Sequence, residues 1–179
     1  MSTLQAENAA EQICIRAYDA ADATQAAAVW NEIVREGNAF PQETELRDAE
    51  AHAFFAEQSF TGIACPPGER ETVLGLYILH PNNIGRCGHL ANASYAVAAC
   101  LRGRRIGERL VLHSIDKAQE LGFSVLQFNA VVAENTAALA LYKKLGFIQL
   151  GRIPGGFRLP DGSYTDIIPH YICTDSARD

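Results

Sequence analysis

The chain has 179 residues, of which 48% are hydrophobic and 20% are charged, and this composition suits a single globular domain. A formal net charge of −6 argues against nucleic acid as a partner, because binding to phosphates depends on Lys and Arg. The sequence has no apolar run of membrane-spanning length and no secretion signal at its start, so we expect a cytoplasmic protein without a membrane partner.

Three strands and two helices are predicted in the first half of the chain. Apolar residues that alternate with polar ones indicate strands, and apolar residues that recur every three or four positions indicate helices. These patterns predict a strand at 12–18, a helix from Asp22 to Glu36, a second helix opening near Pro41 and Thr44, and strands at 60–64 and 72–79. Trp30, Phe54 and Phe55 suit either a core or an interface, so a homodimer is one assembly that the sequence allows.

The second half is predicted to continue the alternation of strands and helices. We expect a strand at 88–98, a helix at 106–121, a buried strand at 125–132, a short helix at 137–145 capped by Asn135, and strands at 147–152 and 164–173. The stretch 154–162 is rich in turn-forming residues and is predicted to be a loop. This order predicts an α/β domain with a mixed, mainly antiparallel sheet over residues 12–173, between tails at 1–11 and 174–179.

Cysteine and histidine residues give no indication of a metal site. The five cysteines lack Cys-x-x-Cys spacing, and the five histidines do not share a spacing typical of metal ligands. We therefore expect reduced thiols and no bound metal.

A basic, glycine-containing segment before the helix at 106–121 has the features of an anion site. It reads Arg102-Gly103-Arg104-Arg105-Ile106-Gly107. Glycine lets the backbone approach an anion closely, the start of a helix presents unpaired N–H groups, and arginine side chains add positive charge. The segment therefore predicts a site for a diphosphate.

Two segments together resemble the GNAT superfamily of N-acetyltransferases. The segment 102–107 is similar to the acetyl-CoA motif Gln/Arg-x-x-Gly-x-Gly/Ala of that family, although Arg105 stands where glycine is usual. Residues 135–147, from Asn135 to Gly146-Phe147, resemble the closing helix of the family. The resemblance implies a GNAT-like fold with about seven strands, a splayed parallel strand pair and about four flanking helices.

The resemblance also implies acetyl-CoA as acyl donor and a set of residues that bind it. By position in the family motifs, these residues are Tyr95, Val97, Arg102, Gly103, Arg104, Arg105, Ile106, Gly107, Glu108 and Asn135. The backbone N–H of Tyr95 would meet the thioester oxygen, and Asn135 would tether the pantetheine arm. Asn135 can equally serve as a plain helix cap, and the two roles are compatible.

For catalysis, the resemblance assigns Tyr142 as the general acid that protonates the leaving thiolate. Many members of the family place a glutamate on the strand before the diphosphate loop, but this strand contains no carboxylate, so His89 is its titratable candidate for the base. An ordered water is the alternative base. Asn92 and Ser94 are predicted to orient the acceptor amine, and Arg158 to lie near an acceptor carboxylate.

The resulting prediction is an acetyl-CoA-dependent N-acetyltransferase that acts on a small amine or an amino-acid-like acceptor by direct attack on the thioester. Residues 154–158 are loosely similar to a subgroup that includes fungal acetyltransferases for proline analogues. Two alternatives stay open at this point. One is a non-catalytic domain that binds acyl-CoA as a sensor, and the other is an N-acetyltransferase that acts on proteins or peptides.

Overall fold

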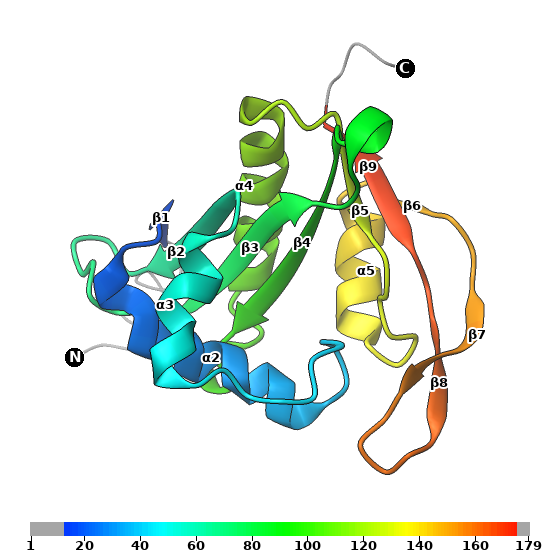
Figure 1. The fold of residues 1–179 in the computed structure, drawn as a ribbon, viewed down its shortest axis with the longest axis horizontal. Coiled ribbons are helices and arrows are strands. Elements are labelled where there is room, and N and C mark those ends of the chain that lie inside the picture. Colours follow the sequence, from blue (N-terminus) through cyan, green and yellow to red (C-terminus); the bar gives the residue numbers. More distant parts are fainter. Residues whose placement is uncertain (1–12, 175–179) are drawn as a thin grey trace.

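The computed structural model describes residues 13–174, and within them seven strands form one mixed sheet (Figure 1). In spatial order the strands are β1 (Cys14–Ala17), β2 (Phe60–Cys65), β3 (Gly75–Pro81), β4 (Leu90–Val97), β5 (Val125–Phe128), β9 (His170–Cys173) and β6 (Ile148–Gln149). Neighbouring strands pair antiparallel except for β4 and β5, which run parallel. The predicted mixed, mainly antiparallel sheet is therefore confirmed.

Four α-helices cover the two faces of the sheet (Figure 1). One face carries α2 (Ala23–Glu36) and α3 (Asp48–Ala56), and the other carries α4 (Ile106–Glu120) and α5 (Thr136–Lys144). Short 3₁₀ turns, η1 (Ala20–Asp22), η2 (Gly85–Cys87) and η3 (Ala99–Leu101), connect some of these elements. Within the described residues, no helix is long and apolar enough to cross a membrane.

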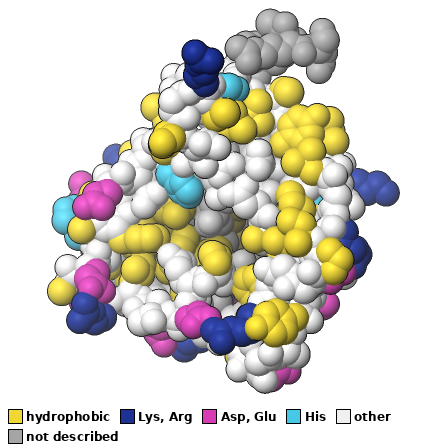
Figure 2. Space-filling view, turned by 45° about the vertical axis from the view of Figure 1, so that its right-hand side comes forward, with side chains coloured by type: hydrophobic (Ala, Val, Ile, Leu, Met, Phe, Trp, Pro, Cys, Tyr) yellow, Lys and Arg dark blue, Asp and Glu magenta, His cyan; other side chains and the backbone are white. Residues whose placement is uncertain are grey.

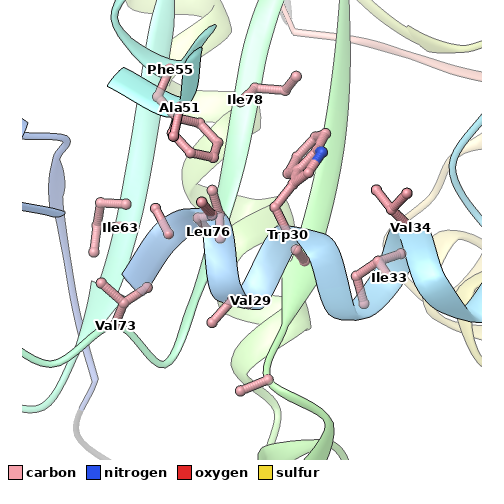
Figure 3. Close-up of a cluster of buried hydrophobic side chains, with 14 of the residues drawn as sticks. Val29, Trp30, Ile33, Val34, Ala51, Phe55, Ile63, Val73, Leu76 and Ile78 are labelled. Atoms are coloured by element: carbon pink, nitrogen blue, oxygen red, sulfur yellow. The ribbon is translucent and has the colours of Figure 1, made fainter. Parts of the chain in front are cut away.

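The aromatic residues of α2 and α3 belong to the core of the domain. Trp30 and Phe55 lie in a cluster of buried hydrophobic side chains (Figure 3), and each is 1% exposed. Trp30 also packs against the rings of Phe40 and Phe54. Small and aliphatic side chains from the facing strands, including Ile63 and Leu76, complete this cluster. The structure therefore assigns these aromatics to a core and not to an interface.

The C-terminal strands differ from the prediction. The segment expected as a loop contains β7 (Ile153–Arg158), which pairs with β8 (Tyr164–Ile167) in a separate two-stranded sheet. The strand predicted at 164–173 is divided between β8 and β9, because Pro169 lies between them and has no N–H for a ladder. All but one residue of β7 is exposed, so its sequence shows no apolar alternation, and its proline and glycines predict a loop instead.

Several predicted boundaries are also corrected by the structure. The second helix begins at Asp48 rather than near Pro41, and β6 has only two residues within the predicted strand 147–152. The strand predicted at 125–132 ends at Phe128, and its pairing with β4 already ends at Leu126. The predicted tails at 1–11 and 174–179 lie outside the described residues, apart from Thr174, which is buried and hydrogen-bonded to residues 123 and 124.

A buried ion pair joins β1 to the start of α2. The guanidinium of Arg16 donates to both carboxylate oxygens of Asp22, at 2.6 and 2.7 Å, and the backbone N–H of Asp19 donates to the same carboxylate at 2.8 Å. The side chains of Arg16 and Asp22 are only 10% and 5% exposed. Burial alone would raise the pKa of Asp22, but the bonds from Arg16 and Asp19 keep that pKa below its ordinary value.

We predict that Asp22→Asn lowers the free energy of unfolding by about 3 to 5 kcal/mol, because it leaves the buried guanidinium of Arg16 without its counter-charge. Glu50→Gln is the matched control, since Glu50 pairs with Arg47 at the surface and its loss should leave the free energy of unfolding nearly unchanged. Urea unfolding of the two variants measures both values. Equal losses for the two variants would contradict the structural role of the buried pair.

Candidate functional site

The two parallel strands part from one another and leave a cavity between them. Pairing between β4 and β5 is confined to Leu90 with Val125 and Ala91 with Leu126, although β4 continues to Val97. A cavity of about 330 Å³ lies beyond the paired residues. Its walls come from the second half of β4, the segment after β5, and the facing sides of α4 and α5.

Backbone groups of β4 point into this parting. In an antiparallel ladder the positions that bond to a given neighbour alternate along the strand. Ala98 donates its N–H to Leu74, and Leu90 accepts from Asn82, so the even-numbered residues of β4 bond toward β3. The N–H groups of Tyr95 and Val97 therefore point the other way, toward the side where β5 has already left.

The predicted anion loop has the left-handed backbone that such loops require. Gly103 has a φ of 81°, and Arg105, the residue preceding α4, has a φ of 60°. The first hydrogen bond of α4 runs from Arg109 N–H to Arg105 O at 3.2 Å. The N–H groups of the residues before Arg109 therefore have no partner within the helix and are available to an anion.

A second cavity, of about 410 Å³, extends the first one toward the anion loop. Tyr95 and Asn135 line both cavities, and Val97 and Arg102 line the second. Gly107 lines the first, whereas Arg104 and Arg105 are exposed beside the start of α4. The structure thus brings Tyr95, Val97, Arg102, Gly107 and Asn135 to two adjoining cavities. Gly103, Ile106 and Glu108 line neither cavity, and the side chain of Ile106 is buried in the core.

Ion pairs hold two of these predicted residues. Arg102 donates to Glu36 of α2 at 2.7 Å, across the second cavity. Glu108 accepts from Lys144 of α5 at 2.5 Å, and this ammonium lowers the pKa of Glu108. Both pairs link the anion loop and α4 to neighbouring helices.

Asn135 begins α5 at the edge of the cleft. Its side-chain oxygen accepts from the backbone N–H of Ala138 at 3.1 Å, which is the geometry of a helix N-cap. Because Asn135 also lines both cavities, the capping role and contact with a ligand are compatible in this structure.

Tyr142 lies on α5 and lines the first cavity. Its ring packs against Phe128 and Phe147, with centroids 4.6 and 5.3 Å away, and it is 9% exposed. Burial raises the pKa of Tyr142 well above its ordinary value, so its hydroxyl stays protonated at neutral pH. Among the described residues, no group forms a hydrogen bond with this hydroxyl.

The residues predicted to bind the acceptor line two different cavities. Asn92 and Ser94 line the first cavity. Arg158 lines a third cavity of about 570 Å³, between the β7–β8 hairpin and the segment after α2, and pairs there with Glu43. Phe40 and Pro41 line both the first and the third cavity, so the two spaces adjoin.

His89 is not brought to the cavity. It lies exposed in the turn before β4, beyond the end where β4 and β5 are paired, and its carbonyl accepts from Ser124 N–H. The parting of the strands is at the other end of β4. The geometry therefore does not support His89 as the base.

Sequence reasoning missed Asn129, which lines the first cavity. Its side chain exchanges hydrogen bonds with Asn82, at 2.6 and 3.2 Å, and accepts from Gln127 at 2.9 Å. The apolar run at 125–132 predicts one continuous strand, with Asn129 inside it. A polar residue within such a run was the available signal.

Comparison with known proteins identifies the family. Residues 26–147 match the model of the acetyltransferase (GNAT) family. The chain is 30% identical over 139 residues to the N-acetyltransferase aca1 of Schizosaccharomyces pombe, covering 69% of this chain and 66% of that protein. Protein SPT10 of Saccharomyces cerevisiae is 29% identical over 96 residues, which cover 51% of this chain and 15% of that protein. The chain thus spans less than two thirds of each of these relatives.

Solved structures show the same fold. A GCN5-related N-acetyltransferase from Kribbella flavida aligns with a TM-score of 0.82 and 34% identity, covering 91% of this chain and 98% of that one. The protein yncA of Salmonella typhimurium, solved with its cofactor acetyl-CoA, aligns with a TM-score of 0.84 and 18% identity over 94% of this chain and 97% of that one.

The chain belongs to the acetyltransferase (GNAT) family, as the sequence resemblance predicted. Family and fold are therefore confirmed. Within the described residues, no group of His, Cys, Asp and Glu side chains is arranged to hold a metal ion.

The backbone of Arg105 leads to a prediction about the anion loop. Within residues 13–174, Arg105 is the one non-glycine residue with positive φ, a conformation that costs an ordinary residue about 1 kcal/mol or more. We predict that Arg105→Gly is more stable than Arg105→Ala by about 1 kcal/mol, measured by urea unfolding. At Arg104, where φ is not positive, the variant Arg104→Gly should be less stable than Arg104→Ala. If the glycine variant were more stable than the alanine variant at both positions, the backbone of Arg105 would not be strained.

Proposed function

We propose that this protein transfers the acetyl group of acetyl-CoA to the nitrogen of a small amine or an amino-acid-like acceptor. The observation that supports this proposal is the continuous cleft that runs from the anion loop through the parting of β4 and β5 to Tyr142. The cleft adjoins a third cavity under the β7–β8 hairpin, which offers a separate approach for an acceptor.

The groups along the cleft fit acetyl-CoA in the order that the molecule requires. The glycine-containing loop and the free N–H groups at the start of α4 suit a pyrophosphate, with Arg102, Arg104 and Arg105 as nearby cations. The outward N–H groups of Tyr95 and Val97, together with Asn135, suit an amide-bearing arm that replaces the missing strand partner. Acetyl-CoA supplies an acyl group that is activated as a thioester.

Two groups are proposed to act on the reacting atoms. The backbone N–H of Tyr95 donates to the thioester oxygen and stabilises the negative charge that develops there. The hydroxyl of Tyr142 donates to the departing sulfur. A phenol has a reference pKa of about 10 and a thiol of about 8.5, so the phenol still carries its proton where the thiolate forms.

Asn92 and Ser94 are proposed to hold the acceptor nitrogen, since both line the cavity that Tyr142 lines. Arg158 is proposed to meet an acceptor carboxylate from the adjoining third cavity, after exchange of its exposed partner Glu43. A small acceptor agrees with the volume of about 330 Å³ between the parted strands. Location in the cytoplasm also belongs to this proposal and agrees with five free cysteines, whereas the homodimer stays a prediction.

The proposed function is tested by adding acetyl-CoA to the purified protein and by measuring CoA release with small primary amines. We expect acetyl-CoA to raise the melting temperature and several amines to release CoA. Binding of acetyl-CoA without CoA release from any amine would instead favour a sensor. Release with peptides alone would favour a peptide acetyltransferase.

We predict that Tyr142→Phe lowers kcat by about a hundredfold or more, because it removes the proton donor for the leaving sulfur. The rise in melting temperature with acetyl-CoA should be unchanged, since the anion loop and β4 are intact. Tyr164→Phe is the matched control, as Tyr164 lies 69% exposed on the hairpin and should retain full activity. Undiminished kcat in Tyr142→Phe would remove this residue from the mechanism.

A further inference from the structure

The wall of the cavity between β4 and β5 is electrically neutral. Polar groups reach it as the amides of Asn92, Asn129 and Asn135, the hydroxyl of Ser94 and two tyrosines, and the remaining wall is apolar or backbone. Within the described residues, no Asp, Glu, Lys, Arg or His side chain lines this cavity. On the face drawn in Figure 2, hydrophobic side chains gather in the central hollow, and most charged ones stand toward the outline of the molecule.

The carboxylates of the two adjoining cavities already have partners. In the cavity toward the anion loop, Glu36 accepts from Arg102, and Glu134 accepts from the hydroxyl of Thr165. The cavity under the hairpin also contains two carboxylates, each in an ion pair, Glu43 with Arg158 and Glu45 with Arg35. Three of these four carboxylates are paired with an arginine, whereas Glu134 keeps its charge in the cavity toward the anion loop. An ammonium group in the neutral cavity would therefore find no counter-charge in the wall that surrounds it.

Other titratable groups lie close to the cavity without lining it. His80 stands opposite Asn92 on β3, with Nδ1 3.0 Å from the carbonyl of Pro81. On the other side, His170 packs behind Tyr142, and its Nδ1 lies 2.7 Å from the carbonyl of Ile168. Burial raises the pKa of Tyr95, as it does that of Tyr142, so both tyrosines that line the cavity stay neutral below pH 9.

We infer that this site accepts its amine only in the neutral, unprotonated form, and that it therefore selects amines of low basicity, with α-amino groups preferred over lysine-type amines. The inference rests on the proposed function, because it concerns the acceptor of the same reaction. Transfer of an ammonium ion from water into a cavity with an uncharged wall is unfavourable. A free amine, by contrast, can accept hydrogen bonds from amides and hydroxyls and donate hydrogen bonds to them.

The size of this preference follows from the protonation of the amine in solution. At pH 7 about 14% of an α-amino group with a pKa near 7.8 is neutral, against about 0.04% of a lysine-type amine with a pKa near 10.4. If both react only as free amines and are otherwise alike, the α-amino group reacts about 300 times faster.

Proton balance agrees with a site that has no charged base. The amine nitrogen forms a bond to the acyl carbon, and the bond between that carbon and the sulfur breaks. The nitrogen loses one proton and the sulfur gains one, so a neutral amine requires no net proton transfer to or from the protein. The Tyr142 hydroxyl can give its proton to the sulfur and regain one from solvent.

Lysinamide provides the test, because it carries an α-amino group and a lysine-type amine in one molecule. The protein and acetyl-CoA are incubated with lysinamide, and the two monoacetylated products are quantified by mass spectrometry or NMR. We expect the α-acetylated product to predominate by about 300-fold at pH 7. The product ratio should fall about fourteenfold between pH 7 and pH 9, because the fraction of neutral lysine-type amine rises faster than that of the α-amino group.

A site that takes up the ammonium and the neutral form of each amine equally, and removes the extra proton itself, would leave the product ratio unchanged with pH, and that result would overturn the inference. An excess of the lysine-type product at pH 7 would also overturn it. The same measurements are made on aminoacetonitrile, glycinamide, ethanolamine and propylamine, in order of increasing basicity. Here kcat/KM at pH 7 should fall along the series, and the spread should narrow at pH 9. If none of these amines causes release of CoA, that result contradicts the proposed function instead.

Asn92→Asp places a carboxylate in the wall with little change of shape. We expect it to shift the products of lysinamide toward the lysine-type amine several-fold at pH 7, because an ammonium then has a counter-charge inside the cavity. Asn83→Asp is the matched control, because it makes the same chemical change in the exposed turn after β3, outside the cavity. Equal product ratios for both variants and the unaltered protein would contradict the role of the neutral wall.

Discussion

The parting of β4 and β5 is the constraint on which the site depends. Two parallel strands that pair at Leu90 and Ala91 and then separate leave backbone donors of β4 without a strand partner. Buried N–H groups need a hydrogen-bond acceptor, and the other groups of the cleft lie around these unpaired donors of β4. An extended ligand with its own amides can replace the missing strand, and the anion loop lies at the end of the same strand.

Packing on both faces of the sheet holds the parting open. On one face, α2 buries Trp30 and reaches the turn after β4 through Glu32, which accepts from Ala99 N–H at 2.8 Å, and through Glu36, which accepts from Arg102. On the other face, α5 packs Tyr142 against Phe128, the last residue of β5, and against Phe147. The same contacts that close the core therefore also position Tyr142 and the anion loop.

Charge is distributed unevenly around the cleft. Arginines and paired carboxylates surround it at the anion loop and under the hairpin, whereas the central cavity is lined by amides, hydroxyls and apolar groups. Such an arrangement suits a doubly charged linkage at one end and an uncharged reacting centre in the middle. Under the proposed function, binding of the donor and choice of the acceptor thus depend on different parts of one cleft.

The sequence by itself determined the family, the order of the main strands and helices, and the anion loop, because these depend on local periodicity, glycine and helix caps. It could not show that β5 ends at Phe128, that residues 153–158 form a strand, or that Asn129 faces the cavity, since partners distant in sequence decide these features. The sequence also indicated His89 as a candidate base, because His89 lies next to a strand of the site. Only the tertiary structure shows that β4 parts from β5 at the end away from His89. Pairing between strands decides where backbone groups remain free, and that pairing is not a local property of the chain.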